Sequence, residues 1–63
     1  MRAAVIMNYE ENGEDYPVGR IEPEAGGRVA VVLDGGEPRI FRNLNAALTA
    51  IREQDGLPNA YLI

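Results

Sequence analysis

The side chains on which most enzymes rely are missing from this chain. Its 63 residues contain no cysteine, histidine or tryptophan, and they also contain no serine or lysine. The only side-chain hydroxyls belong to Thr49, Tyr9, Tyr16 and Tyr61. Nucleophilic catalysis uses Ser, Cys, Thr, Lys or a carboxylate, and acid–base catalysis near neutral pH most often uses His. We therefore expect a protein that is not an enzyme.

Carboxylates are the chemically active groups that remain, and four of them gather around one Asn-Gly pair. These four are Glu10, Glu11, Glu14 and Asp15. Paired carboxylates hydrolyse glycosides only where a concave site holds the sugar between them, and this spacing does not match an EF-hand calcium loop. In an enzyme, Asp34 and Glu37 would be the other candidate catalytic carboxylates. A structural zinc site normally needs Cys or His. We predict no catalytic, cofactor-binding or metal-binding residue.

The charge balance disfavours two kinds of partner. Six arginines against ten acidic residues give a formal net charge of −4. A negative chain is poorly attracted to phosphate backbones and anionic lipids, so nucleic acid is a disfavoured partner and we expect no membrane partner. No run approaches the ~20 apolar residues of a membrane span, and residues 3–7 are too few for a signal-peptide core. The expected location is the cytoplasm.

The length predicts a single domain, residues 1–63, of limited stability. A domain of ~60 residues buries only about 60% of the surface that its unfolded chain exposes. Without cysteine, no disulfide can compensate. The missing stability must therefore come from ideal packing or from burial against a partner, and small domains commonly gain it by oligomerisation.

Apolar alternation predicts a first strand over residues 1–9 and a return strand over residues 16–22. Asn12-Gly13 favours a tight type I′ turn between them, with positive φ at both residues. In the return strand, Pro17 offers no ladder donor and Gly19 permits a bulge.

The strongest strand pattern covers residues 28–33 and predicts the centre of the sheet. Asp34-Gly35-Gly36 predicts a second two-residue hairpin turn, after which residues 38–41 return as a short strand. With either possible turn centre, Ile40 pairs with Val29 or Val31.

Residue spacing near the end of the chain predicts one helix. Asn43 is its expected N-cap, because apolar residues follow at the spacing of one helical face: Leu44, Ala47, Leu48 and Ile51. The helix should end near Gln54, since Gly56 can adopt the left-handed conformation and Pro58 blocks continuation. Residues 59–63 predict a last strand. The predicted class is α+β, a small antiparallel sheet of four to five short strands with one helix packed on one face.

The predicted central strand is apolar on both sides. A strand with one solvated face should alternate apolar and polar residues, and residues 28–33 do not. If the odd-numbered residues pack under the helix, Ala30 and Val32 lie on the other face beside Phe41. Two interpretations remain open. Other segments wrap over this second face, or it contacts a second copy or another protein.

The acidic hairpin tip also has alternative interpretations. A turn centred on residues 12 and 13 sets Glu11 against Glu14 and Glu10 against Asp15, and such like-charge pairs are destabilising. The carboxylates can serve solubility and protect the sheet edge. They can instead dock into a basic groove, where complementary potential speeds association. Cation binding is the third alternative.

The positions of the arginines also allow two interpretations. Arg39 and Arg42 flank Phe41 just before the predicted helix. Arginine beside an aromatic ring supports nucleic-acid stacking or a protein hot spot. The alternative is that these arginines, with Arg20 and Arg28, pair with nearby glutamates on a solvated surface.

The expected function is binding of another protein without catalysis. A stoichiometric inhibitor or modulator of a larger machine with a basic groove fits best, as in phage-type inhibitors of host defence nucleases. The alternative is a homodimeric structural or regulatory module joined through the apolar sheet face; a nucleic-acid-binding ribbon is the remaining hypothesis. The predicted partner-binding residues are Glu10, Glu11, Glu14, Asp15, Ala30, Val32, Arg39, Phe41 and Arg42.

Overall fold

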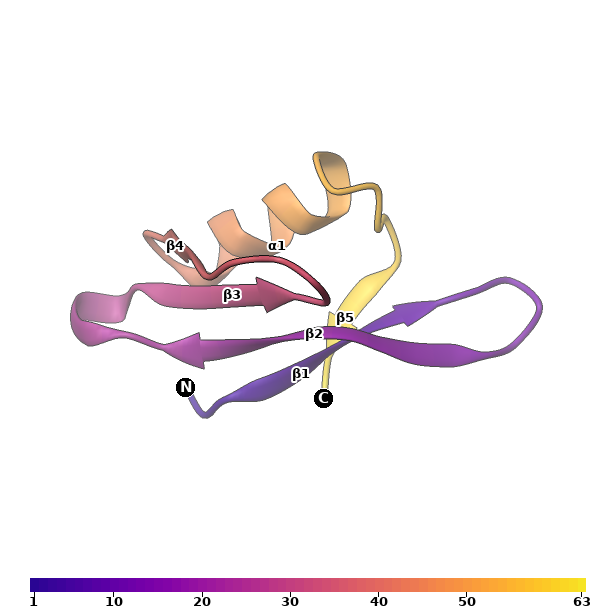
Figure 1. Cartoon of the computed structure of the whole chain (residues 1–63), viewed down its shortest axis with the longest axis horizontal. Coiled ribbons are helices and arrows are strands. Elements are labelled where there is room, and N and C mark those ends of the chain that lie inside the picture. The colour runs from indigo at the N-terminus through magenta and orange to yellow at the C-terminus, as the bar shows by residue number, and fades with distance from the viewer.

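The computed structural model describes residues 1–63, the whole chain, as one antiparallel sheet of five strands with a single α-helix. The strands are β1 (Ala4–Tyr9), β2 (Asp15–Pro23), β3 (Val29–Leu33), β4 (Arg39–Phe41) and β5 (Ala60–Leu62). A 3₁₀ turn, η1 (Ala25–Gly27), joins β2 to β3, and the helix α1 (Leu44–Glu53) lies between β4 and β5 (Figure 1). The predicted α+β class is confirmed.

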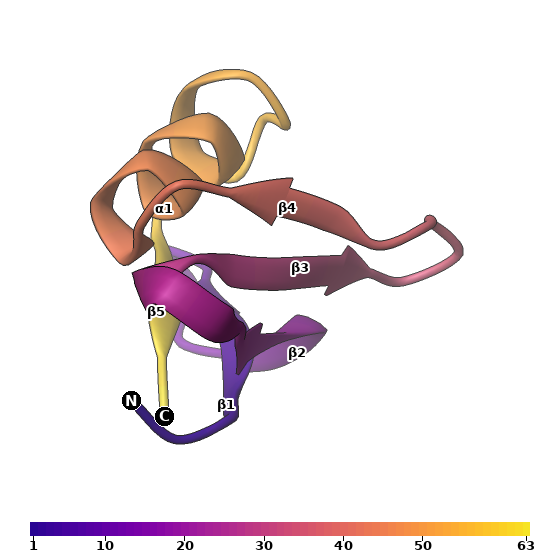
Figure 2. The same ribbon diagram turned by 90° about the vertical axis from the view of Figure 1, so that its left-hand side faces the viewer.

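The helix connects the two edges of the sheet. Strand order is β4-β3-β2-β1-β5, so the first four strands form a meander and α1 carries the chain to the opposite edge (Figure 2). The central strand is β2, so the prediction that residues 28–33 form the centre of the sheet is wrong. There β5 pairs antiparallel with β1, with Leu62 opposite Ile6. The core fills the space between α1 and the sheet and consists of Ile6, Ile21, Val29, Val31, Ala47, Ile51 and Ala60. Only nine of 63 residues are buried, so further burial against a partner would add substantially to stability.

The helix ends follow the sequence prediction. The Asn43 side chain accepts a hydrogen bond from the Ala46 N–H at 2.8 Å, as an N-cap residue does. At the other end, Gln54 is the C-cap and Gly56 has a φ of 73°. The Leu57 N–H then donates to the Ile51 carbonyl at 3.3 Å, which satisfies one of the carbonyls left free at the helix end. Both predicted helix signals are confirmed.

The turn between β1 and β2 differs from the prediction. The Gly13 N–H donates to the Glu10 carbonyl at 2.9 Å, and the Glu10 N–H donates to the Glu14 carbonyl at 3.2 Å. Gly13 has a φ of 95°, whereas no non-glycine residue has a positive φ. The connection is therefore a type I turn followed by a left-handed glycine, the common three-residue hairpin loop. The type I′ prediction is wrong because Asn12 keeps an ordinary backbone conformation.

A bulge in β2 restores the register that this longer loop changes. Met7 pairs with Pro17, but Ile6 pairs with Gly19, so Val18 is the extra residue. Gly19, which we expected to permit a bulge, lies directly beside it. Because of the bulge, Tyr16 and Ile21 lie on the same face of the sheet although one has an even and the other an odd number.

The register between β3 and β4 corrects a second prediction. Phe41 pairs with Val29, Ile40 with Ala30 and Arg39 with Val31. An odd number of residues, 32–38, separates Val31 from Arg39, whereas a two-residue turn would leave an even number. The predicted pairing of Ile40 is therefore wrong. Phe41 packs against the core, and Ile40 takes the place on the second face that was predicted for Phe41.

Candidate protein-binding surfaces

One face of the sheet has no layer over it. The helix and the core lie on the other side, so side chains that alternate with the core residues point away from α1. We call this the open sheet face, and its members are Val5, Met7, Pro17, Arg20, Glu22, Ala30, Val32, Ile40, Tyr61 and Ile63. Two predicted partner-binding residues, Ala30 and Val32, lie on it and are half-buried.

Large apolar side chains on the open sheet face contact solvent. The exposed fraction is 40% for Val5, 55% for Ile40 and 68% for Ile63. These residues come from β1, from the β4 edge and from the end that follows β5. No other segment covers them, so the interpretation in which loops wrap over the second face is wrong. Val5 and Ile63 are neighbours at the β1–β5 edge, and Ile40 lies at the opposite edge, beyond β3 and β2. Exposed apolar patches are typical of interaction surfaces.

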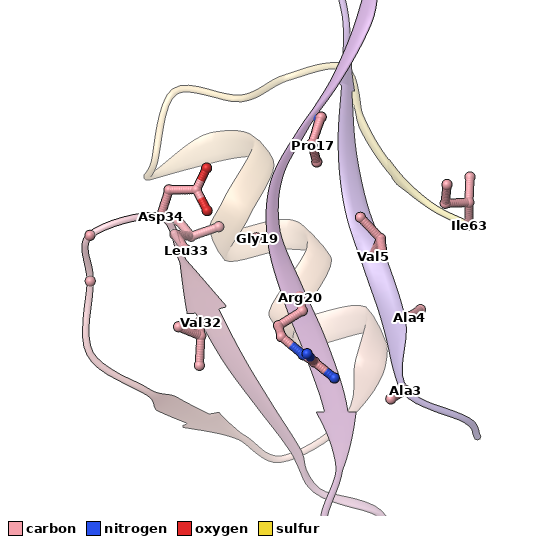
Figure 3. Close-up of a pocket in the computed structure, with 12 residues that line it drawn as sticks. Ala3, Ala4, Val5, Pro17, Gly19, Arg20, Val32, Leu33, Asp34 and Ile63 are labelled. Carbon is pink, nitrogen blue, oxygen red and sulfur yellow. The ribbon is translucent and has the colours of Figure 1, made fainter.

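The middle of the open sheet face is hollowed. A depression of about 500 Å³ is lined by residues of β1, β2 and β3 and by the glycines of the β3–β4 loop, Gly35 and Gly36. Figure 3 views this side of the sheet with α1 behind it, and shows the Arg20 side chain between Val32 and Val5. Gly19 contributes no side chain here. The lining therefore combines apolar residues with one cationic side chain, Arg20, and one carboxylate, Asp34.

Arg20 forms an ion pair on this face with Glu22, at 3.1 Å. Both side chains remain about half exposed, 61% and 52%. Such a pair contributes little to the stability of the isolated chain, because water screens it. The prediction that these arginines pair with nearby glutamates holds for Arg20.

Arg39 is engaged within the molecule instead. Its guanidinium pairs with Asp55 at 2.6 Å and lies 5.5 Å from the centroid of the Phe41 ring. The predicted cluster of Arg39, Phe41 and Arg42 is therefore divided, because the first two hold β4 against the end of the helix. Arg42 is exposed and makes no ion pair or side-chain hydrogen bond.

The β1–β2 hairpin extends away from the rest of the molecule. Residues 9–15 have no ladder partners other than each other, with Tyr9 opposite Asp15, whereas the adjoining parts of β1 and β2 also pair with β5 or β3. We call this segment the hairpin arm. It accounts for the elongated shape, 38 × 21 × 21 Å, and its loop lies at the end opposite η1 (Figure 1).

The four predicted carboxylates of the hairpin arm divide into two pairs. Asp15 accepts a hydrogen bond from the Tyr61 hydroxyl, and Glu10 accepts one from the Tyr16 hydroxyl at 3.2 Å. Glu11 and Glu14 make no side-chain hydrogen bond or ion pair. Two of the four charges are therefore held in place, and two are free to contact a partner.

Tyr61 contacts the hairpin arm through Asp15, and the sequence analysis did not predict this contact. The hydrogen bond to Asp15 raises the pKa of the Tyr61 hydroxyl, and desolvation and the Asp15 charge act in the same direction. Each of these effects favours the neutral hydroxyl over the phenolate. No local sequence signal links positions 15 and 61, because β5 meets the arm only in the folded sheet.

A second, separate chain of hydrogen bonds begins at Asn8, on the core side of the sheet. Asn8 is 8% exposed, and its Nδ2 donates to the Tyr16 hydroxyl at 3.0 Å, which in turn donates to Glu10. The Asn8 Oδ1 is buried without a hydrogen-bond partner. This chain of hydrogen bonds connects the core to the acidic loop and fixes the direction of the arm.

The side chains show no arrangement that could hold a metal ion, since no three His, Cys, Asp or Glu side chains converge. No helix is long and apolar enough to cross a membrane. Comparison with protein-family models, with curated proteins and with solved structures gave no match. The open sheet face and the hairpin arm are the two candidate binding surfaces of the molecule.

Proposed function

We propose that this chain is a small non-catalytic binding protein that docks on a larger protein through its hairpin arm. The observation that carries this proposal is the pair of free carboxylates, Glu11 and Glu14, at the end of a projecting hairpin. The simplest role is a stoichiometric inhibitor or modulator that acts in the cytoplasm. A phage-type inhibitor of a host defence nuclease is one example of such a role.

The chemistry of the arm favours a partner with a basic groove. The whole chain has a net charge of −4, and the arm carries four of its ten acidic residues. A nucleic-acid-handling protein offers a groove of the opposite sign, and complementary potentials increase the association rate. The arm is narrow because only β1 and β2 form it, so it can enter a groove that excludes the rest of the sheet (Figure 1).

The internal hydrogen bonds support this role by holding the arm in one direction. Tyr61 binds Asp15, and Tyr16 binds Glu10, so binding needs little further ordering of these side chains. A segment that is already ordered loses less conformational entropy when a partner binds. We expect Asp15 and Glu10 to hold the arm in its orientation, and Glu11 and Glu14 to contact the partner.

The test begins with a tagged pull-down from the native cell, which identifies the partner, and continues with association kinetics. The double variant Glu11→Gln/Glu14→Gln should slow association at least about tenfold at low salt and flatten its salt dependence. The matched control, Glu24→Gln/Glu53→Gln, makes the same charge change away from the arm. Equal association rates for the two double variants would contradict docking through the arm.

A further inference from the structure

The open sheet face has an arrangement of charges that the hairpin arm does not explain. Arg20 and Glu22 lie on β2, the central strand, and apolar side chains surround them on both sides. We propose that a second copy of this chain packs on this face, so that two sheets stack with their helices outside. This proposal is independent of the partner that the arm binds.

The size of the molecule sets how much of the face a stable dimer must use, and the bounding rectangle below also includes the hairpin arm. The molecule measures 38 × 21 × 21 Å, so the rectangle that bounds one side is about 800 Å². A standard interface buries about 800 Å² on each partner, and stacked sheets pack about 10 Å apart. A dimer of standard size would therefore bury most of the face. The apolar residues of the face extend across all five strands, from Ile40 on β4 to Ile63 beside β5.

The register of β2 and β3 makes the face complementary to itself. Arg20 pairs with Val32 in one row, and Glu22 pairs with Ala30 in the next row. A two-fold axis that runs between these rows, across the strands, exchanges them. Each Arg20 then lies over Glu22 of the second copy, and each Val32 lies over Ala30 of the second copy.

Both exchanged pairs match in their chemistry. The guanidinium meets a carboxylate, so the central charges are neutralised twice across the interface. The branched Val32 meets the small Ala30, which leaves room for it between the sheets. An isologous interface requires this kind of reciprocal match, because the same patch occurs on both subunits. Like charges at these two positions would instead repel at the centre of the face.

The edges of the sheet are poor alternatives for self-association. β4 and β5 are the two edge strands, and each has only three residues. Pro38 and Arg39 stand at the start of β4, and proline and charged residues discourage strand addition. Stacking through the face is therefore the arrangement that the sheet permits.

The first test measures mass against concentration by sedimentation equilibrium. The wild-type chain should change from the monomer mass of 6.9 kDa to twice that mass between about 1 µM and about 1 mM. Val32→Glu should raise the dimer dissociation constant at least about a hundredfold, because it places a charge against Ala30 of the second copy. Thr49→Glu, on the exposed side of α1, is the matched control and should leave the dissociation constant unchanged.

The second test exploits the reciprocal ion pair. Arg20→Glu alone and Glu22→Arg alone should each be monomeric, because each sets like charges against one another across the axis. Mixed in equal amounts, the two variants should form a one-to-one dimer, since every cross pair is then Glu against Arg. Arg2→Glu mixed with Glu53→Arg carries the same net charges away from the face and should gain nothing from mixing.

Three results would overturn the proposal. These are a wild-type chain that stays monomeric at about 1 mM, a dimer that Val32→Glu leaves intact, and charge-reversal variants that do not combine on mixing. A monomer whose Val32→Glu variant loses a partner captured through the arm would assign the face to that partner instead. Circular dichroism of each variant separates loss of association from loss of folding.

Discussion

Position 19 in β2 has no room for a side chain. A Cβ at Gly19 would overlap the carbonyl oxygen of Val32 and would lie 2.9 Å from the Cα of Leu33. Backbone atoms cannot move aside as the end of a side chain can. We expect Gly19→Ala to lower the free energy of unfolding by about 2 kcal/mol, a typical cost of overpacking. Urea denaturation measures this as a lower midpoint with an unchanged slope.

Gly36→Ala is the matched control for this substitution. A Cβ at Gly36 would meet the Leu33 carbonyl oxygen at 3.3 Å, and this glycine does not have a positive φ. We expect a much smaller loss, because a small shift of the exposed loop relieves the contact. Equal midpoints for the two variants would show that β2 and β3 can separate at Gly19 without cost.

The hydrogen bond between Tyr61 and Asp15 has a consequence at alkaline pH. The bond raises the pKa of Tyr61, so the folded protein keeps this hydroxyl protonated after the unfolded chain has lost the proton. The contribution to stability is fully present below the unfolded pKa of about 10 and is lost as pH rises through the folded value. The free energy of unfolding should therefore fall with rising pH in that range.

A tyrosinate absorbance titration measures this directly. Asp15→Ala should move the pKa of Tyr61 back towards its ordinary value, and Tyr61→Phe identifies which step in the titration belongs to this residue. Glu14→Ala removes a carboxylate from the same arm without touching Tyr61, and should leave that step in place. If Asp15→Ala leaves the pKa of Tyr61 unchanged, the hydrogen bond between the two side chains does not persist in solution.

At the scale of elements, one arginine joins the helix to the last strand. The Arg52 Nε and one of its terminal nitrogens donate to the Ala60 carbonyl at 2.9 and 2.8 Å. β5 has only three residues and one neighbouring strand, so few other contacts hold it. We expect Arg52→Ala to cost about 1.5 kcal/mol, the low end of the range for hydrogen bonds that involve a charged group.

The loss of stability in Arg52→Ala should be confined to the edge of the sheet that β5 forms. Amide exchange of Ile63, whose N–H donates to the Val5 carbonyl at 3.0 Å, should become faster in Arg52→Ala. Arg52→Lys should recover only part of the protection, because an ammonium group cannot reproduce the paired guanidinium contact. Glu53→Ala, on the next helical position, is the control that should not change exchange at Ile63.

The elements also show why local patterns predict a helix better than a hairpin register. Asn43, Gly56 and the apolar spacing between them act within one segment, so the predicted boundaries of α1 hold. The strand register of each hairpin, in contrast, depends on how many residues its loop contains. A difference of one residue moves Ile40 to the open face and Phe41 to the core side.

At the scale of the whole molecule, a stacked dimer links stability to concentration. Folding is then coupled to association, so the thermal midpoint of the wild-type chain should rise as protein concentration increases. Val32→Glu should remove this dependence, since it blocks the open sheet face. Scanning calorimetry over a hundredfold range of concentration measures both, and a midpoint that stays constant for the wild-type chain would argue against a dimer.

The sequence by itself determined the α+β class, the helix with its caps and the presence of a second apolar face, and it permitted a bulge at Gly19. Each of these follows from short-range spacing or from the backbone freedom of one residue. The tertiary structure decided which side chains occupy that face, which arm carboxylates stay free, and that Arg39 and Arg52 bind within the molecule. These depend on loop lengths and on β5 returning beside β1, and such long-range contacts leave no local pattern to read.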